Sequence, residues 1–145
     1  FWSYVGMAKP ARERYEKGVT GGGNKSLRTV LYTMADAQIK CRGMYRDVYD
    51  REKIKLEVSE KMVVSRNTQG KEVTVAWKDA KPSHRHGAGI RKIIKHFLCD
   101  LWVAWREIEG LPTRPIYPIE YLGHTHFIHP KERGWEYTVK LKRTK

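Results

Sequence analysis

The stretch from His84 to Glu109 limits the possible folds more than any other part of the chain. Its apolar residues recur at the spacing of one face of an α-helix, and Gly110 and Pro112 mark its end. The positions that form this stripe are Ile90, Ile93, Ile94, Phe97, Leu98, Leu101, Trp102 and Trp105. The pattern predicts one long helix, starting near His84 or Gly87, whose apolar face belongs to the core.

Two further helices and a β-hairpin are predicted ahead of this long helix. The first helix should run from Asn24 to about Arg42, where Gly43 stops it, and the second from about Met44 to Glu60. The apolar positions of the first helix are Leu27, Val30, Leu31, Met34 and Cys41. Two short β-type runs follow at 62–65 and 72–77, and the loop between them, 66–71, is longer than two residues.

The two ends of the chain complete the predicted fold. Residues 1–8 predict the end of a helix or an apolar plug that docks on the core, and residues 111–145, with four prolines, predict an extended tail. The fold class is therefore mainly α with a small β-hairpin (α+β): three principal helices plus an extended Pro-rich C-terminal tail. At 145 residues we expect a single domain over 1–145, with the hairpin at 61–78 as an insertion.

The run from Gly18 to Arg28 combines a glycine-rich backbone and a helix start with positive charge. Its glycines let the backbone fold closely, and Asn24 can cap the following helix by accepting a hydrogen bond from a free amide. The unpaired amides of that first helical turn, with Lys25 and Arg28 beside them, form a seat for a phosphate group. Alternatively, the run is only a loop and a helix cap.

The balance of charge favours a polyanionic partner. The chain has 29 Lys and Arg residues against 16 Asp and Glu, a formal net charge of +13 and a pI of about 9.9. The excess positive charges repel one another and destabilise the folded chain unless a polyanion binds to the surface. Nucleic acid is therefore the first candidate partner and an anionic membrane the second. No apolar run approaches the roughly 20 residues that span a bilayer, and no cationic amphipathic helix is predicted. We therefore predict no membrane contact.

The basic residues gather at 9–28, 81–95 and 131–145. In the long helix, Arg91, Lys92 and Lys95 lie off the apolar stripe, so we expect them to face outward and follow phosphates. The alternative is a solvated basic face. The predicted nucleic-acid-binding residues are Arg12, Arg14, Lys17, Thr20, Gly22, Gly23, Asn24, Lys25, Arg28, Arg91, Lys92 and Lys95.

Two H-x-H pairs are the candidate metal ligands. His84 with His86, and His124 with His126, could supply imidazole nitrogens to zinc or another transition metal. However, metal ligands usually project from rigid elements with supporting hydrogen bonds, whereas these pairs lie near a helix start and in a Pro-rich tail. We prefer phosphate contact, helix-end hydrogen bonding or packing as their role, and we predict no metal or other cofactor in this chain.

Ser26 is the candidate nucleophile, since Lys25 is its neighbour. A seryl nucleophile needs a base and an activating geometry, and local hydrogen bonding in a capped turn is the more common role of such a serine. The sequence also lacks a DxD, ExxH or spaced carboxylate set that could hold the two metal ions of a nuclease. We therefore assign no catalytic residue.

The two cysteines, Cys41 and Cys99, both fall in apolar helical stretches without a CxxC neighbour. This pattern predicts buried thiols rather than a disulfide framework. It indicates a cytoplasmic location, where thiols stay reduced.

Four stretches together resemble a known family. They are Tyr4-Val5-Gly6-Met7, the run from Gly18 to Arg28, the Tyr-Arg-x-x-Tyr pattern within 44–51, and the basic then apolar helix of 84–110. In this order and spacing they are similar to the carboxy-terminal domain of IS110/IS116/IS902-type transposases, in a divergent, archaeal-looking form. The resemblance covers about residues 1–130.

The resemblance implies a part of a DNA recombinase. The parent proteins have an amino-terminal RuvC-like domain with acidic metal ligands, their carboxy-terminal domain supplies a serine nucleophile, and RNA-guided target choice is known in the family. The implied partners are therefore DNA, a guide RNA and a second copy of the full-length protein, and a divalent metal is expected only in the RuvC-like domain. Because the chain opens on Phe1 rather than Met, we interpret it as the C-terminal part of a longer transposase.

Two departures from the family pattern bear on activity. The RuvC-like acids are absent from this sequence, and the family's S-G-G stretch is replaced by residues 11–18, which contain no serine. The hairpin also looks like an insertion. The function predicted from the sequence is thus a DNA-binding domain, also able to bind RNA, of an IS110-like transposase or recombinase. The alternatives are a stand-alone, non-catalytic nucleic-acid-binding module derived from one, and a small metal-dependent hydrolase that uses the H-x-H pairs.

Overall fold

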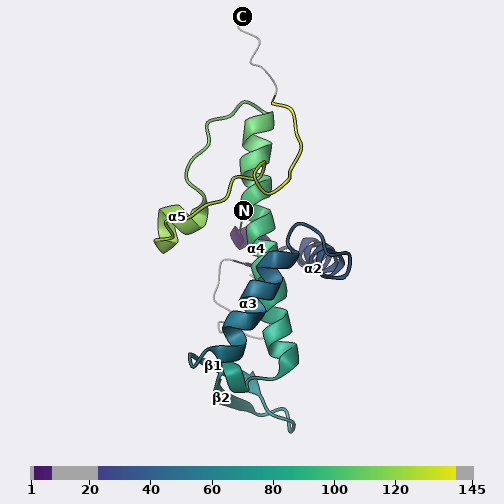
Figure 1. Cartoon of the computed structure of the whole chain (residues 1–145), viewed down its shortest axis with the longest axis vertical. Helices are drawn as coiled ribbons and strands as arrows, with labels where there is room; N and C mark the ends of the chain where they lie inside the picture. The colour runs from purple at the N-terminus through teal and green to yellow at the C-terminus, as the bar shows by residue number, and fades with distance from the viewer. Residues whose placement is uncertain (1, 8–22, 140–145) are drawn as a thin grey trace, which may run out of the picture. The chain divides into compact units, whose positions relative to one another are not determined.

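The computed structural model describes residues 2–7 and 23–139 (Figure 1). The chain divides into two compact units, Phe1–Lys95 and His96–Lys145. The fold is mainly helical, with three longer helices and a two-stranded antiparallel hairpin, as the sequence predicts. None of the described helices has the length and apolar character that would let it cross a membrane.

The elements follow one another in a simple order. They are α1 (Trp2–Val5), α2 (Lys25–Lys40), α3 (Arg46–Val58), β1 (Met62–Arg66), β2 (Glu72–Ala76), a 3-10 turn (Trp77–Asp79), α4 (Pro82–Ile108) and α5 (Tyr117–Leu122). The first unit holds every element as far as the first half of α4, and the second unit holds the rest of α4 and α5.

The core of the first unit is built mainly from α1, α2, α3, β1 and α4. Its buried apolar side chains are Trp2, Val5 and Met7 in or after α1, Leu31 and Ala35 of α2, Tyr45, Val48, Tyr49 and Leu56 around α3, Val63 of β1, Ala80 after the 3-10 turn, and Ile90, Ile93 and Ile94 of α4. The burial of Val5 and Met7 confirms that the start of the chain forms an apolar plug.

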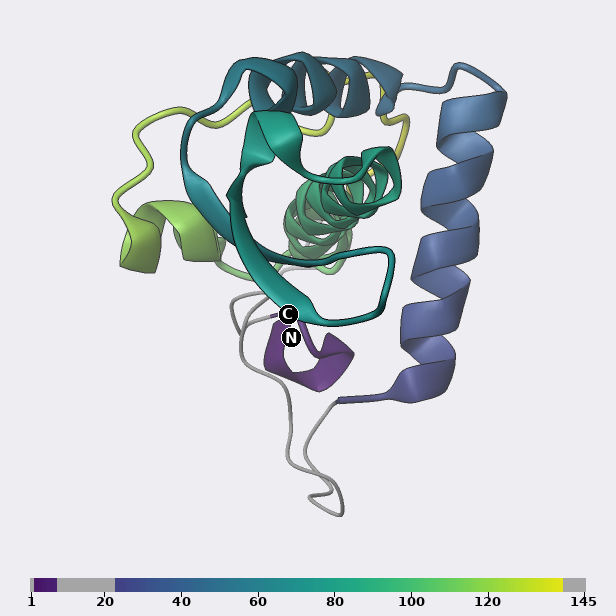
Figure 2. The ribbon, with the colours of Figure 1, turned by 90° about the horizontal axis from the view of Figure 1, so that it is seen from below.

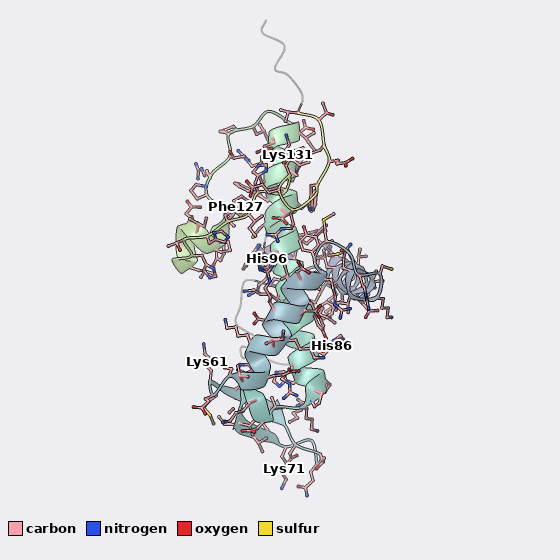
Figure 3. The ribbon with its side chains drawn as sticks, in the orientation of Figure 1. Lys61, Lys71, His86, His96, Phe127 and Lys131 are labelled. Carbon is pink, nitrogen blue, oxygen red and sulfur yellow. The ribbon has the colours of Figure 1, made fainter. Side chains whose placement is uncertain are left out.

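The hairpin pairs β1 with β2 in antiparallel register, from Met62 opposite Ala76 to Arg66 opposite Glu72. Its loop is closed by Asn67, whose amide donates to the Lys71 carbonyl at 2.9 Å and whose side-chain oxygen accepts from the Lys71 amide at 2.9 Å. The loop therefore has five residues, in agreement with the prediction of more than two. Lys71 lies in this hairpin loop (Figure 3).

The long helix begins earlier than the sequence predicts, at Pro82 rather than near His84 or Gly87. Proline suits a first helical position, because its missing N–H is not needed there. The Arg85 guanidinium stabilises this start, since its Nη1 donates to the Lys78 and Ala80 carbonyls, each at 2.8 Å. Arg85, which lies in one of the basic clusters, thus holds the preceding turn in place.

In the second unit, residues 129–137 form a strap along the second half of α4. Arg133 of the strap pairs with Asp100 at 2.8 Å, and the Trp135 ring lies 5.6 Å from the Phe97 ring. A turn shapes the strap, since the Arg133 and Trp135 amides both donate to the Pro130 carbonyl at 3.0 Å. Asp100 and Phe97 project from one side of α4, so the strap covers that side.

Several predicted positions differ in the structure. Val30, Cys41 and Trp105 are exposed, although each fits the helical spacing of its segment, whereas Cys99 is buried as predicted. Cys41 is exposed because it lies at the C-cap of α2, beyond the last turn that packs on the core. The tail, which was predicted to be extended, also contains the short helix α5.

Candidate nucleic-acid interface

Asn24 joins the start of α2 to α1. Its side-chain oxygen accepts a hydrogen bond from the Leu27 amide at 2.8 Å, which confirms the predicted N-cap. Its own amide donates to the Tyr4 carbonyl at 2.7 Å, and its Nδ2 donates to the Tyr4 hydroxyl at 3.1 Å. Asn24 therefore fixes the first turn of α2 against α1.

Gly23, at the end of the glycine-rich run, allows the backbone to pack closely on α1. It has φ of +73°, which L-residues with a side chain rarely adopt. A Cβ at this position would collide with the Tyr4 carbonyl oxygen and with the Gly6 backbone. The close approach that Gly23 allows is therefore to the chain's own α1 segment, which leaves the amides of the next turn, at Lys25 and Ser26, on an exposed helix start.

Two predicted phosphate-binding residues meet at α1 from different elements. Arg28 of α2 donates through Nε to the Val5 carbonyl at 3.5 Å. Lys95 of α4 places its ammonium nitrogen 5.1 Å from the centre of the buried Trp2 ring, a cation–π contact. Two basic segments that are far apart in the sequence, the start of α2 and the first half of α4, thus each contact α1 through one basic residue. Figure 2 shows the ribbons of these elements.

The acidic residues of these elements lie away from the convergence. The one acid of α2, Asp36, pairs with Lys40 in the last turns of that helix at 2.6 Å. In α4 the residues before Asp100 include no acid. Lys25 is exposed, and Arg91 and Lys92 are half-buried rather than fully outward as predicted. The described residues 24–35 and 82–99 therefore carry basic side chains and no acid.

The remaining predicted residues divide into two groups. Arg12, Arg14, Lys17, Thr20 and Gly22 lie outside the described residues. Ser26 is exposed in the first turn of α2, and among the described residues no His, Asp or Glu side chain hydrogen-bonds to its hydroxyl. The described geometry thus offers no activating partner for Ser26.

The histidine pairs make local contacts. The His84 Nδ1 lies 3.2 Å from the Ser65 hydroxyl with the ring against Trp77, and burial lowers the pKa of His84. The His86 Nδ1 lies 2.7 Å from the Tyr49 hydroxyl (His86 is labelled in Figure 3). His124 and His126 are exposed. Within residues 2–7 and 23–139, no three His, Cys, Asp or Glu side chains are grouped closely enough to hold a metal ion.

A cluster that the sequence did not predict surrounds Glu107 in the second unit. The His129 ring donates through Nε2 to one Glu107 oxygen at 2.9 Å, and the Tyr137 hydroxyl donates to the other at 2.8 Å. Burial alone would raise the pKa of Glu107, but these two hydrogen bonds lower it on balance. Burial and the hydrogen bond to Glu107 raise the pKa of Tyr137 to about 12. The cluster ties the strap to α4.

This cluster predicts a pH window for the second unit. Since the folded pKa of Glu107 is lowered, its contribution to stability is complete above the ordinary value of 4.5 and is lost as the pH falls through the folded pKa. Since the folded pKa of Tyr137 is raised, its contribution is complete below 10.0 and is lost as the pH rises through about 12.

Urea unfolding of the wild type, Glu107→Gln and Tyr137→Phe across this range measures both effects. At neutral pH the wild type should have a larger free energy of unfolding than either variant. Its difference from Glu107→Gln should disappear in acid, and its difference from Tyr137→Phe should disappear at high pH. Differences between the variants that stay constant with pH would contradict the cluster.

The family models, the curated proteins and the solved structures compared with this chain include no significant match. Its function is therefore argued from its own residues.

Proposed function

We propose that this chain is a DNA-binding domain of an IS110-like transposase or recombinase, and that the surface around α1 binds DNA phosphates. The observation that carries the proposal is the convergence on α1, where Arg28 of α2 and Lys95 of α4 contact the same short helix. The family resemblance of the four sequence stretches supports the assignment to a transposase.

The phosphate contacts follow from the chemistry of the two helix segments. The exposed first turn of α2 offers backbone amides and the positive end of a helix dipole, and Lys25 adds a full charge. Arg91 and Lys92 extend the charge along α4, four and three residues before Lys95, which contacts Trp2. Arg28 and Lys95 also hold α1, so they connect the DNA-binding surface to the core of the first unit.

A charge-matched pair of variants tests the proposal. The first variant carries Lys25→Gln, Arg91→Gln and Lys92→Gln, which leaves the residues that hold α1 intact. The second carries Lys53→Gln, Lys55→Gln and Lys61→Gln, three exposed lysines on α3 and the loop before β1. Both variants lose the same net charge. A difference between them in DNA affinity therefore depends on where the replaced residues lie and not on the number of charges.

The measurement is the anisotropy of a labelled 20-base-pair DNA duplex over a salt series. We expect wild-type affinity to fall steeply with salt, because each phosphate contact adds about 0.9 to the log–log slope. The α2/α4 variant should bind more weakly, with a slope reduced by up to about 3, whereas the α3 variant should stay close to the wild type. Equal losses in the two variants, or a wild-type affinity that ignores salt, would reject this surface.

A further inference from the structure

Two tyrosines of α5 form an exposed aromatic pair in the second unit. Tyr117 and Tyr121 lie one helical turn apart, with ring centres 5.1 Å apart and ring planes inclined by 32°. Tyr121 is 65% exposed and Tyr117 is 38% exposed. Large aromatic rings usually bury most of their surface, so this pair presents an unusual amount of aromatic area to solvent.

The backbone around α5 holds the pair in place. The helix follows the buried side chain of Ile116, whose carbonyl accepts from the Ile119 amide at 2.9 Å and from the Glu120 amide at 3.0 Å. At the other end Gly123 takes a left-handed conformation, and the His124 amide donates to the Pro118 carbonyl at 3.1 Å. Backbone hydrogen bonds therefore hold both ends of this short helix, which carries the two rings one turn apart.

Side chains that can donate hydrogen bonds to phosphate flank the pair along the chain, which as a whole carries a formal net charge of +13. Arg114 precedes α5, and His124 and His126 follow it, and all three side chains are exposed. Glu120 is exposed within the helix and is the one acid between Gly110 and Lys131. Proteins bind unpaired bases by stacking aromatic rings on them while hydrogen-bond donors and net positive charge hold the phosphates.

We infer that Tyr121, supported by Tyr117, stacks on unpaired nucleobases of single-stranded nucleic acid. This site goes beyond the proposed duplex-binding surface, because it belongs to the other unit and uses aromatic stacking instead of phosphate contacts alone. The chemistry is common to single-stranded DNA and RNA, since every base has a flat aromatic face.

Three labelled 12-mers test the inference at about 150 mM salt: oligo-dT, oligo-U, and a DNA strand of abasic sugars with the same phosphates. We expect the wild type to bind at least one base-containing strand about tenfold more tightly than the abasic strand, because one stacked base contributes on that order. Comparison of the oligo-dT and oligo-U affinities shows whether the site prefers single-stranded DNA or RNA. Equal affinity for all three strands would overturn the inference.

Two substitutions at one position separate stacking from general apolar contact. Tyr121→Phe keeps a ring and should keep the preference for bases, whereas Tyr121→Leu should lose it, about tenfold. Both should leave duplex affinity unchanged, and the Lys25/Arg91/Lys92 variant should retain the preference for bases, so failure of one site does not imply failure of the other. If Tyr121→Leu keeps the preference for bases, Tyr121 does not stack on them and the site is rejected. If the wild type self-associates in sedimentation and Tyr121→Leu does not, the exposed pair is a protein contact instead.

Discussion

Replacing Arg133 by Met is expected to lower the free energy of unfolding by about 3–5 kcal/mol, because it removes the guanidinium that pairs with the buried Asp100 carboxylate. The Asp100 side chain is 1% exposed and that of Arg133 is 9% exposed, and the two are joined at 2.8 Å. A buried charge that loses its partner keeps the full cost of its desolvation. The measurement is urea unfolding followed by circular dichroism.

Two further variants show whether burial is the cause. The double variant Asp100→Leu/Arg133→Met removes both charges and should recover most of the loss, since no unpaired charge remains. Asp36→Asn breaks the exposed pair with Lys40, and we expect little change in the unfolding midpoint because solvent screens that pair. A stable Arg133→Met variant, or a double variant as unstable as the single one, would show that the pair is not buried as described.

The periodic part of the fold could be predicted from the sequence. The spacing of apolar residues identified α2, α3 and α4, and the β-type runs identified the hairpin, because each of these elements buries one face. The exposed side chains Val30 and Trp105 show the limit of this reasoning. A residue at helical spacing is buried only where another element covers it, and periodicity does not show which turns are covered.

The elements that depend on local backbone chemistry were harder to predict. Prolines suggested an extended segment where α5 forms, but Pro118 lies in the first turn of that helix, where a missing N–H is tolerated. Asp36 pairs along its own helix with Lys40, as local spacing can indicate. Asp100 pairs instead with Arg133 in the strap, and no local pattern indicates a partner at that distance in the sequence.

The candidate site was only partly predictable for the same reason. Composition and position gave the basic residues, and the Asn24 cap followed from the residue type at a helix start. The role of α1 did not follow, because the contacts of Arg28 with Val5 and of Lys95 with Trp2 join distant segments. Tertiary packing decides which charged residues share a surface, and here it turned two predicted basic clusters into one candidate surface.

Substitution of Gly23 by Ala is expected to disturb this surface most strongly. The variant forces a side chain into a left-handed backbone, which costs about 1–2 kcal/mol, and its Cβ collides with the backbone of Tyr4 and Gly6. Backbone atoms cannot rotate away as a flexible side chain can, so the collision adds about 1–3 kcal/mol or displaces α1 from α2. We also expect DNA affinity to fall, since α1 joins the basic segments of α2 and α4.

Gly70→Ala provides the matched control. Gly70 has a similar φ of +79°, but a Cβ there meets no atom within 4 Å. Gly70→Ala should therefore show the backbone cost alone and retain DNA affinity. The difference between the two variants in urea unfolding isolates the contact between Gly23 and α1, and the anisotropy assay shows whether that contact supports binding. If both variants lose the same stability and bind DNA equally, the close packing of Gly23 on α1 has no part in forming the surface.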